Sequence, residues 1–363
     1  RGDTDGMIRW AALLVALLAT CAGAEPLRIA TFNAELGRDG PGLMLRDIQG
    51  GRDTQVAAVI AVIARIKPDI LALQGVDWDL DGRAMAALSA RLVEAGWPMP
   101  HLFANRPNSG LASDLDLDGD GRIGGAADSQ GYGRFTGQNG IAILSRYPIA
   151  ADKVRDFSTL LWRDLPGATL PTRNGAPFPS ATAQATQRLS STGHWLVPIN
   201  TPLGRISLLT YQAGPPVFDG AEDRNGLRNR DENRFWQVLL DGDLGPLPDA
   251  PFVLLGGSNL DPWDGEGFNQ TLRALLADPR VQDPAPTSTG GAKAGDQGHT
   301  GPDAQDTVDW PGVGRYRVDY VLPSTHWRVM DSGVFWPAPG EPGAQDASDA
   351  SRHRLVWVDI ALP

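Results

Sequence analysis

The chain is poor in cysteine and in positive charge, and both shortages exclude classes of function. Its 363 residues include one cysteine, Cys21, which excludes a disulfide framework and a cysteine-based zinc site. The 32 Lys and Arg residues are outnumbered by 43 Asp and Glu, so the formal net charge is −11. No overall positive field would attract a polyanion such as DNA, although a local basic groove is compatible with this composition.

Long hydrophobic runs are scarce as well. The N-terminal stretch from Met7 has a short basic region with Arg9, an apolar run over 11–19 and a small-x-small cleavage site at Ala22-Gly23-Ala24. We therefore expect residues 1–24 to be upstream residues followed by a secretory signal peptide, and the protein to be exported, either periplasmic or secreted. The alternatives are an uncleaved anchor and lipidation at Cys21, because Leu18-Ala19-Thr20-Cys21 resembles a lipobox. No later segment has the roughly 18 apolar residues that predict a membrane span.

Residues 25–363 alternate short β-like runs with helical patterns, without repeats or linkers, which predicts one domain. The strand candidates are apolar on both faces and therefore buried: 27–32, 69–74, 140–144, 206–211, 252–256, 316–322 and 354–360. Amphipathic periodicity predicts helices over 54–66, 83–95 and 231–240. Buried strands covered by helices indicate an α/β layered fold. The long connections 105–138, 163–187 and 283–315 are expected to carry binding or catalytic groups.

Five motifs, in order along the chain, resemble those of the endonuclease/exonuclease/phosphatase superfamily. They are LRIATFNAE at 27–35, KPDILALQ at 67–74, GGSN at 256–259, RVDYVL at 317–322 and SRH at 351–353. The resemblance implies an α/β (α+β) fold, a four-layer sandwich of two mixed β-sheets flanked by helices, over residues 25–363. It also implies hydrolysis of phosphodiesters or phosphomonoesters that depends on Mg²⁺ or Mn²⁺.

Site residues follow from the same resemblance. Asn33 and Glu35 match metal-binding positions, and His353, Asn259 and Asp319 match catalytic ones. In such a site a divalent cation polarises the phosphoryl oxygen, while a histidine and an Asp–Asn pair position and deprotonate water. Hard oxygen ligands suit Mg²⁺, which keeps several waters.

Four positions depart from the family pattern: Gly75 stands for the metal-binding Glu, Gly257 for the Asp of G-D-x-N, Arg352 for the Asp of S-D-H, and Gln212 for a His. We expect the loss of the acid before His353 to remove the carboxylate that orients the imidazole, and the cation of Arg352 to favour the neutral imidazole. The site is therefore predicted to be degenerate, as in a pseudoenzyme. Asp77 or Asp261 would rescue it by supplying a carboxylate; Asp77 would share a strand face with Gly75.

A calcium-loop pattern lies in the first long connection. Asp116, Asp118 and Asp120, followed by Gly121, match positions 1, 3, 5 and 6 of a Ca²⁺-binding loop over 116–128. Position 12 is Ala127 instead of a bidentate Glu, and an acidic residue follows it. The pattern favours a calcium-stapled loop, and the alternative is an acidic solvated turn.

A segment dense in Arg, Asn and carboxylates follows the 206–211 strand candidate. Arg224, Arg228 and Arg230 could bind a phosphate there, since ligands gather at strand ends in α/β proteins. The alternative is a loop stabilised by its own salt bridges. Two functions therefore stay open: an exported hydrolase of a phosphorylated small molecule or nucleic acid, or a non-catalytic relative that binds a phosphorylated ligand or a protein partner.

Overall fold

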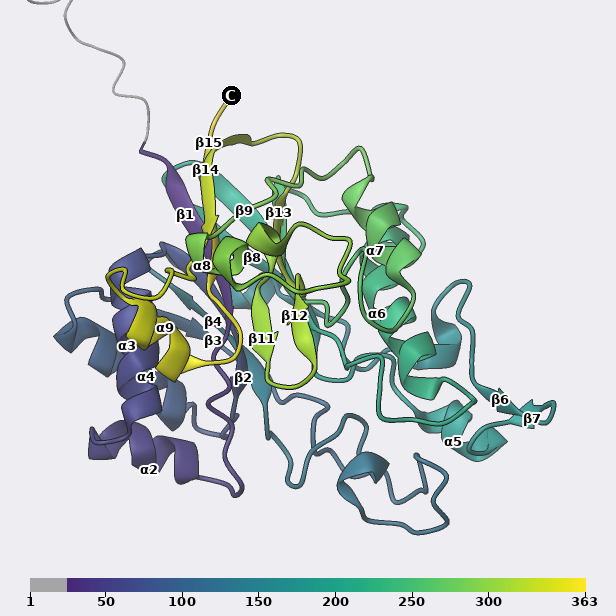
Figure 1. The fold of residues 1–363 in the computed structure, drawn as a ribbon. Helices are drawn as coiled ribbons and strands as arrows, with labels where there is room; N and C mark the ends of the chain where they lie inside the picture. Colours follow the sequence, from purple (N-terminus) through teal and green to yellow (C-terminus); the bar gives the residue numbers. More distant parts are fainter. Residues whose placement is uncertain (1–24) are drawn as a thin grey trace, which may run out of the picture.

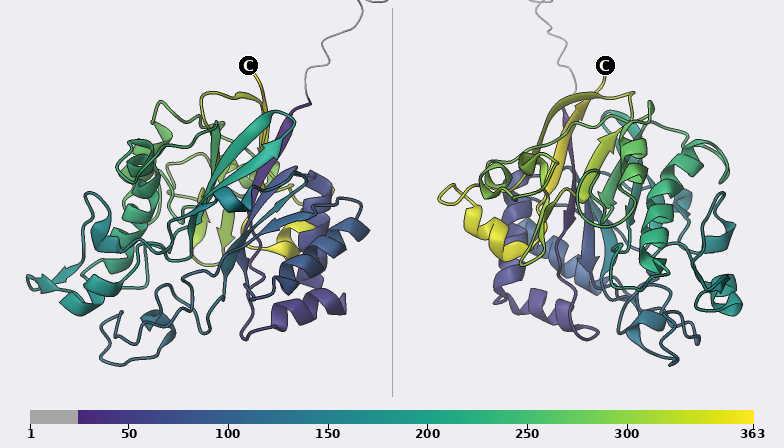
Figure 2. Two further views of the ribbon diagram at one scale, coloured as in Figure 1. Left: turned by 180° about the vertical axis from the view of Figure 1, so that it is seen from behind. Right: turned by 45° about the vertical axis from the view of Figure 1, so that its right-hand side comes forward.

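The computed structural model describes residues 25–363, so the expected signal peptide and Cys21 lie outside the described residues. Two β-sheets pack face to face at the centre, and helices lie on their outer sides (Figures 1 and 2). The first sheet has the order β14-β15-β1-β2-β4-β3. It is mixed, since β1 is parallel to β2 and antiparallel to β15. Its strands are β1 (Leu27–Asn33), β2 (Ile70–Val76), β3 (His101–Phe103), β4 (Gly140–Ser145), β14 (Arg328–Val334) and β15 (Val356–Ala361).

The second sheet has the order β13-β10-β9-β8-β5. It is also mixed, because β10 is parallel to β9 and antiparallel to β13. Its strands are β5 (Arg155–Asp156), β8 (His194–Thr201), β9 (Gly204–Gln212), β10 (Phe252–Gly257) and β13 (Asp319–Pro323). Two small hairpins lie outside the sheets: β6 (Thr172–Arg173) with β7 (Ala176–Pro177), and β11 (Val308–Trp310) with β12 (Gly314–Tyr316).

Helices form the two outer layers. The first sheet is covered by α2 (Leu43–Gly50), α3 (Thr54–Ile66), α4 (Arg83–Glu94) and α9 (Ala344–Ala350), and the second by α6 (Arg224–Leu240) and α7 (Asn269–Leu276). Two short helices, α5 (Ala181–Thr186) and α8 (Thr289–Ala294), lie within the long connections. Among residues 25–363, no helix combines the length and the apolar character needed to cross a membrane.

The central strands contribute to two hydrophobic cores each. In β1, Ile29 packs between the sheets, while Ala30 and Phe32 face the outer helices. Leu254 of β10 likewise packs under α6, and its neighbour Val253 packs between the sheets. This double burial explains why the strand sequences are apolar on both faces. The predicted four-layer sandwich is confirmed.

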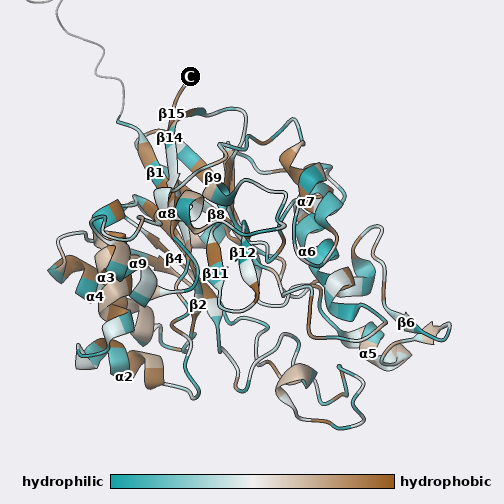
Figure 3. Ribbon diagram, viewed as in Figure 1, coloured by the Kyte–Doolittle hydropathy of each residue, from teal (hydrophilic) through white to brown (hydrophobic). Residues whose placement is uncertain are grey.

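The helix predicted over 54–66 has those bounds, and the Asp53 carboxylate caps it by accepting from the Val56 amide at 2.8 Å. The helix predicted from 231 is wrong at its start, since α6 begins at Arg224. Figure 3 shows α6 as largely hydrophilic. Its first half buries polar side chains such as Asn229 and Glu232, so apolar periodicity does not reveal it.

The strand predicted over 316–322 is also wrong, because β12 ends at Tyr316 and β13 begins at Asp319. The backbone amides of the two residues between them donate to side chains instead of to a neighbouring strand. The Arg317 amide donates to Asp261 at 2.8 Å, and the Val318 amide donates to Thr307 at 3.0 Å. This interruption places Asp319 at the first position of a buried strand.

Candidate active site

Strand ends from both sheets meet at one edge of the sandwich. Asn33 ends β1 and Gly257 ends β10, and Asp319, which begins β13, is the register partner of Gly257. His353 lies three residues before β15, which runs antiparallel to β1. A cavity of about 1150 Å³ opens at this edge, and Asn33, Glu35, Asn259, Arg352 and His353 are among its lining residues. The structure therefore brings together the motifs that the sequence places far apart.

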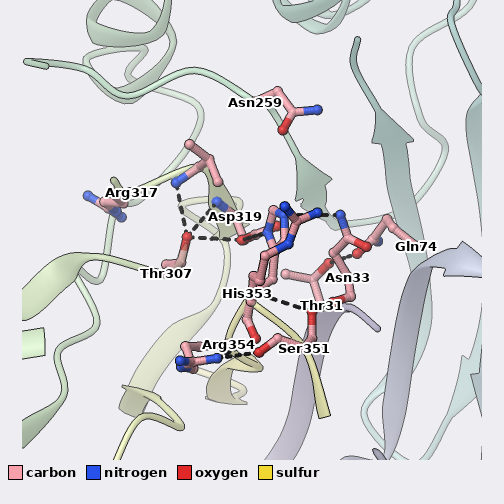
Figure 4. Close-up of polar contacts among 12 residues, drawn as sticks. Thr31, Asn33, Gln74, Asn259, Thr307, Arg317, Asp319, Ser351, His353 and Arg354 are labelled. Atoms are coloured by element: carbon pink, nitrogen blue, oxygen red, sulfur yellow. Dashed lines mark hydrogen bonds and ion pairs between the residues drawn. The ribbon is translucent and has the colours of Figure 1, made fainter. Parts of the chain in front are cut away.

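A buried hydrogen-bonded chain runs from Thr307 through Asp319 to His353 (Figure 4). The Thr307 hydroxyl donates to Asp319 Oδ2 at 2.9 Å, and His353 Nδ1 lies 2.8 Å from the same oxygen. Asp319 is fully buried, and its other oxygen, Oδ1, has no hydrogen-bond partner among residues 25–363. A carboxylate accepts only, so Nδ1 of His353 carries the proton. This is the arrangement of an imidazole oriented for acid–base chemistry.

The expectation that His353 has lost its orienting carboxylate is wrong. Asp319, from another motif, orients the imidazole, and residue 352 does not contact it through its side chain. Thr307 was not singled out by its sequence; only the length of the 283–315 connection hinted at function. It is held beside His353 because the Arg354 amide donates to the Thr307 carbonyl at 2.7 Å.

The second imidazole nitrogen faces the end of β1. Nδ2 of Asn33 lies 3.3 Å from Nε2 of His353, so the deprotonated Nε2 accepts a long hydrogen bond. In Figure 4 the Asn33 side chain points toward the ring of His353. Since both residues line the cavity, Nε2 can accept a proton from a bound water when the Asn33 amide turns away from its single lone pair.

Glu35 is already engaged by the residues before His353. Its Oε1 accepts from Nε of Arg352 at 2.9 Å, and its Oε2 accepts from the main-chain N–H of Arg352 at 2.9 Å. The Ser351 hydroxyl lies 3.1 Å from Oε2. Burial acts to raise the pKa of Glu35, but the hydrogen bonds and charge of Arg352 outweigh it and hold the pKa below its usual value. Glu35 is therefore an ionised partner of a guanidinium.

Gly75 lies in a backbone conformation that a side chain opposes. Its φ is +67°, and the strand register between β2 and β4 shifts at this position. A Cβ on Gly75 would lie 2.5 Å from Oδ1 of Asn33 and 2.9 Å from the backbone nitrogen of Glu35. Since one of these obstacles is main chain, no carboxylate fits here without moving the end of β1.

Gly257 differs from Gly75, because its space is taken by a side chain. A Cβ on Gly257 would lie 2.1 Å from Oε1 of Gln212, its register partner in β9. That oxygen is buried and has no hydrogen-bond partner in the described part of the chain. Asn259, two residues further on, donates to the Ala213 carbonyl at 2.7 Å and stands apart from the His353 group in Figure 4.

The two expected rescuing carboxylates bind main-chain amides. Asp77 accepts from the amides of Arg38 and Asn139 at 2.9 and 3.1 Å, and it is not among the residues that line this cavity. The register shift at Gly75 explains why Asp77 does not share the strand face that even spacing predicts. Asp261 lines the cavity, but one oxygen accepts from Trp263 at 2.7 Å and the other from Arg317 at 2.8 Å.

The residues at this edge therefore do not fit the divalent cation that the family resemblance implies. Glu35 is paired with a guanidinium, and Gly75 has no space for an acid. Within residues 25–363, the one group of three His, Cys, Asp or Glu residues arranged to hold a metal is Asp116, Asp118 and Asp120. Their candidate ligand atoms lie within 4.8 Å of one another.

The 116–128 loop folds around its own acidic side chains. Asp116 accepts from the amides of Gly119 and Gly121 at 2.6 and 3.0 Å. Burial and, to a smaller extent, the charges of the neighbouring acids raise the pKa of Asp118 above its usual value. Asp128 is buried and accepts from the Leu117 amide at 2.9 Å, so it links the two ends of the loop.

The three arginines predicted to bind phosphate do not form one cluster. Arg228 is buried and donates to main-chain carbonyls, including that of Leu189 at 2.8 Å. Arg230 pairs with Asp231 at 2.6 Å and is not among the cavity-lining residues. Arg224 lines the cavity and donates to the Leu117 carbonyl of the acidic loop.

A buried polar network at the cavity wall, where Glu232 is a lining residue, is another feature that sequence reasoning missed. Glu232 lies on α6 and accepts from the Gly214 amide at 2.8 Å, and burial raises its pKa to about 7. His194 lies 2.8 Å from the Ser190 hydroxyl and 3.0 Å from the Glu232 carbonyl, and burial lowers its pKa to about 3. Both imidazole nitrogens therefore have partners while the ring is neutral.

Comparison with known proteins agrees with this architecture. The model of the Endonuclease/Exonuclease/phosphatase family matches residues 30–353. A solved endonuclease/exonuclease/phosphatase from Beutenbergia cavernae DSM 12333 is 18% identical, with a TM-score of 0.54 over 93% of this chain and 72% of that one. A family protein from Leptotrichia buccalis C-1013-b is 16% identical, with a TM-score of 0.51 over 93% of this chain and 100% of that one. No curated protein sequence matches. The solved structures share the fold, and the family match spans most of the sequence. The chain therefore belongs to the endonuclease/exonuclease/phosphatase family.

Proposed function

We propose that this protein is an exported phosphoesterase in which His353 activates water for attack on a bound phosphoester. The observation that carries the proposal is the buried Thr307–Asp319–His353 chain at the cavity wall. Export rests on the signal-peptide pattern over residues 7–24.

The geometry supports one sequence of proton movements. Neutral His353 accepts a proton at Nε2 from water as the oxygen attacks phosphorus. Asp319 stabilises the resulting imidazolium through Nδ1, and its second oxygen adds negative charge without a competing partner. The leaving alkoxide departs on the opposite side of phosphorus and takes a proton from water, and the imidazolium releases its proton to solvent, so that the products are an alcohol and a phosphate.

The cavity suits a phosphorylated small molecule. Its volume of about 1150 Å³ exceeds what a phosphate group needs, so a larger organic part fits beside it. The lining includes exposed aromatic side chains, with Phe218 at 87% and Tyr132 at 67% exposure. A net charge of −11 does not favour long nucleic acids.

The second candidate function is binding without turnover. It is favoured by the contact of Arg352 with Glu35, because this carboxylate is then engaged in an ion pair. In that case a phosphorylated ligand or a protein partner occupies the cavity and is released unchanged.

Turnover of bis(p-nitrophenyl) phosphate separates the two candidates. We expect the purified protein to release p-nitrophenol, and His353→Ala to lower the rate roughly 10²- to 10⁴-fold. His326→Ala is the matched control, since His326 is exposed on the connection between β13 and β14. Equal rates for His353→Ala and His326→Ala would exclude the acid–base role, and thermal stabilisation by inorganic phosphate without turnover would support the binding protein.

We further propose that the acidic loop over 116–128 binds Ca²⁺ as a structural ion. The proximity of Asp116, Asp118 and Asp120 supports this, because Ca²⁺ prefers several oxygen ligands in a flexible loop. The loop also borders the cavity through Ala127 and Ser129. An ion there would stabilise the cavity wall.

A further inference from the structure

The side chain of Arg352 lies where it can act on a ligand beside His353. Its Nε and Nη2 atoms face the Glu35 carboxylate, with Nε at 2.9 Å from Oε1. Within residues 25–363, its Nη1 atom makes no hydrogen bond, and 57% of the side chain is exposed. Arg352 and His353 both line the cavity. The guanidinium is thus anchored on one side and open on the other.

Two further arginines among residues 25–363 line the cavity, but each is bound to main-chain carbonyls on other segments. Arg228 also lines the cavity, but it is buried, and its Nε and Nη2 atoms donate to main-chain carbonyls. Arg224 bonds the Leu117 carbonyl of the acidic loop. Phosphoester recognition requires a cation that compensates the phosphoryl charge. The open guanidinium is the group beside His353 that supplies it.

The acidic positions that would hold a metal ion are sterically closed or already hydrogen-bonded. The Cβ of an acid at position 75 would lie 2.9 Å from the Glu35 backbone nitrogen, at a φ that disfavours side chains. Asp261 uses both oxygens on main-chain amides. A guanidinium carries a permanent charge and five N–H donors in a planar fork, which suits phosphoryl oxygens without a metal.

We propose that Arg352 is the phosphoryl-binding cation of this site, in the place that the family gives to a divalent metal. Glu35 then serves as a positioning residue, because its carboxylate fixes one edge of the guanidinium. Phosphoester binding consequently needs no divalent cation. This inference rests on the proposed function for the location of the ligand, but it concerns binding and not turnover.

Binding of inorganic phosphate, measured by calorimetry in EDTA and again in Mg²⁺, tests the inference. We expect the parent protein to bind with the same Kd, within about twofold, in both buffers. Arg352→Ala should weaken binding roughly 10- to 100-fold, as expected for the loss of charge-assisted hydrogen bonds. Arg352→Lys should fall between the two, because an ammonium lacks the planar fork. Arg328→Ala removes the same charge from an exposed position on β14 and should leave the Kd unchanged.

Glu35→Gln distinguishes a role of Glu35 in positioning Arg352 from a role as a metal ligand. If Glu35 only positions Arg352, the variant keeps phosphate binding in EDTA, because the guanidinium is still present and is less neutralised. If Glu35 is a metal ligand, the variant loses a binding that the parent shows only with Mg²⁺. This comparison does not depend on the folding of Arg352→Ala.

Three results would overturn the inference: binding that appears only with Mg²⁺, a Kd unchanged by Arg352→Ala, or no phosphate binding in either buffer. The outcome for the proposed function is separate. Phosphate binding through Arg352 without turnover of bis(p-nitrophenyl) phosphate leaves the inference standing and removes the catalytic proposal. Turnover that requires added Mg²⁺ removes the inference and leaves the catalytic proposal standing.

Discussion

The two halves of the site differ in what they keep of a phosphoesterase. The half formed by β13 and the residues before β15 holds an oriented imidazole, with Asp319 2.8 Å from His353. The half formed by the ends of β1 and β2 holds Glu35, which pairs with Arg352 of the other half, and a glycine at the position of the expected acid. The difference teaches that the acid–base part depends on β13, whereas the positions expected to bind a metal lie at the ends of β1 and β2. One part can therefore be replaced while the other stays intact.

The largest expected effect falls on the β13 half. Asp319→Asn should lower kcat for bis(p-nitrophenyl) phosphate roughly 10²- to 10⁴-fold, because an amide does not stabilise the imidazolium as a carboxylate does. Thr307→Val should lower it less, since it removes one hydrogen bond to Asp319. Steady-state kinetics across pH give the measurement. Equal effects of the two substitutions would contradict this order and would indicate that Asp319 depends on the Thr307 hydrogen bond for its role.

The next effect contrasts the two glycines. Gly75→Ala should destabilise the protein by about 2–4 kcal/mol, because it combines a left-handed backbone with a main-chain clash. Gly257→Ala should cost less, since the obstacle is the flexible end of Gln212. Urea unfolding of both variants measures the difference. A Gly75→Ala variant as stable as Gly257→Ala would show that the β2 end adapts readily.

A third prediction concerns the pH dependence of stability, which a buried histidine away from His353 influences. His194 has a lowered folded-state pKa of about 3, so the native protein binds fewer protons than the unfolded chain below the ordinary histidine pKa of about 6.5. Its contribution to stability therefore falls by about 2 kcal/mol between pH 6.5 and pH 5. His194→Gln should remove this loss, so the free-energy difference from the parent should shift by that amount in the variant's favour over the same range.

The prediction is stated for the difference in unfolding free energy between variant and parent. The reason is that Glu232 has the opposite effect on how stability depends on pH. Burial raises the pKa of Glu232 to about 7, so its contribution to stability rises as pH falls from 7 toward 4.5. Denaturant unfolding at several pH values gives the two curves. Parallel curves for parent and His194→Gln would show that His194 does not titrate differently in the two states.

The smallest expected effect concerns the acidic loop. Ca²⁺ at about ten times its Kd should stabilise the native protein by about 1.4 kcal/mol. Asp118→Asn should reduce the rise in Tm, because it removes one of three clustered carboxylates. Asp331→Asn, an exposed acid on β14, is the matched control. A Tm that Ca²⁺ leaves unchanged in the parent would identify the loop as a solvated turn.

Sequence predicted those features that depend on local pattern. Apolar strands buried on both faces and the periodic helix over 54–66 are set by short-range spacing, and the structure has both. The five motifs also placed Asn33 and His353 in one site. The pairing of His353 with Asp319 was not predicted, because it joins residues 34 positions apart through the packing of two sheets.

Other features depend on context that spacing does not carry. The polar half of α6 is helical because tertiary partners satisfy Asn229 and Glu232, although its sequence lacks apolar periodicity. Even strand spacing placed Asp77 beside Gly75, and the register shift at Gly75 overrides it. The contact of Arg352 with Glu35 joins the two ends of the chain, so local sequence gave no sign of it.

The left-handed backbone at Gly75 also bears on the direction in which this site can evolve. A single substitution to an acid would introduce strain before it provided a metal ligand, because Asn33 and the Glu35 backbone occupy the space first. A return to the expected acid therefore requires at least two coordinated changes, one of which reshapes the end of β1. The glycine therefore opposes any single substitution that would place an acid at this strand end.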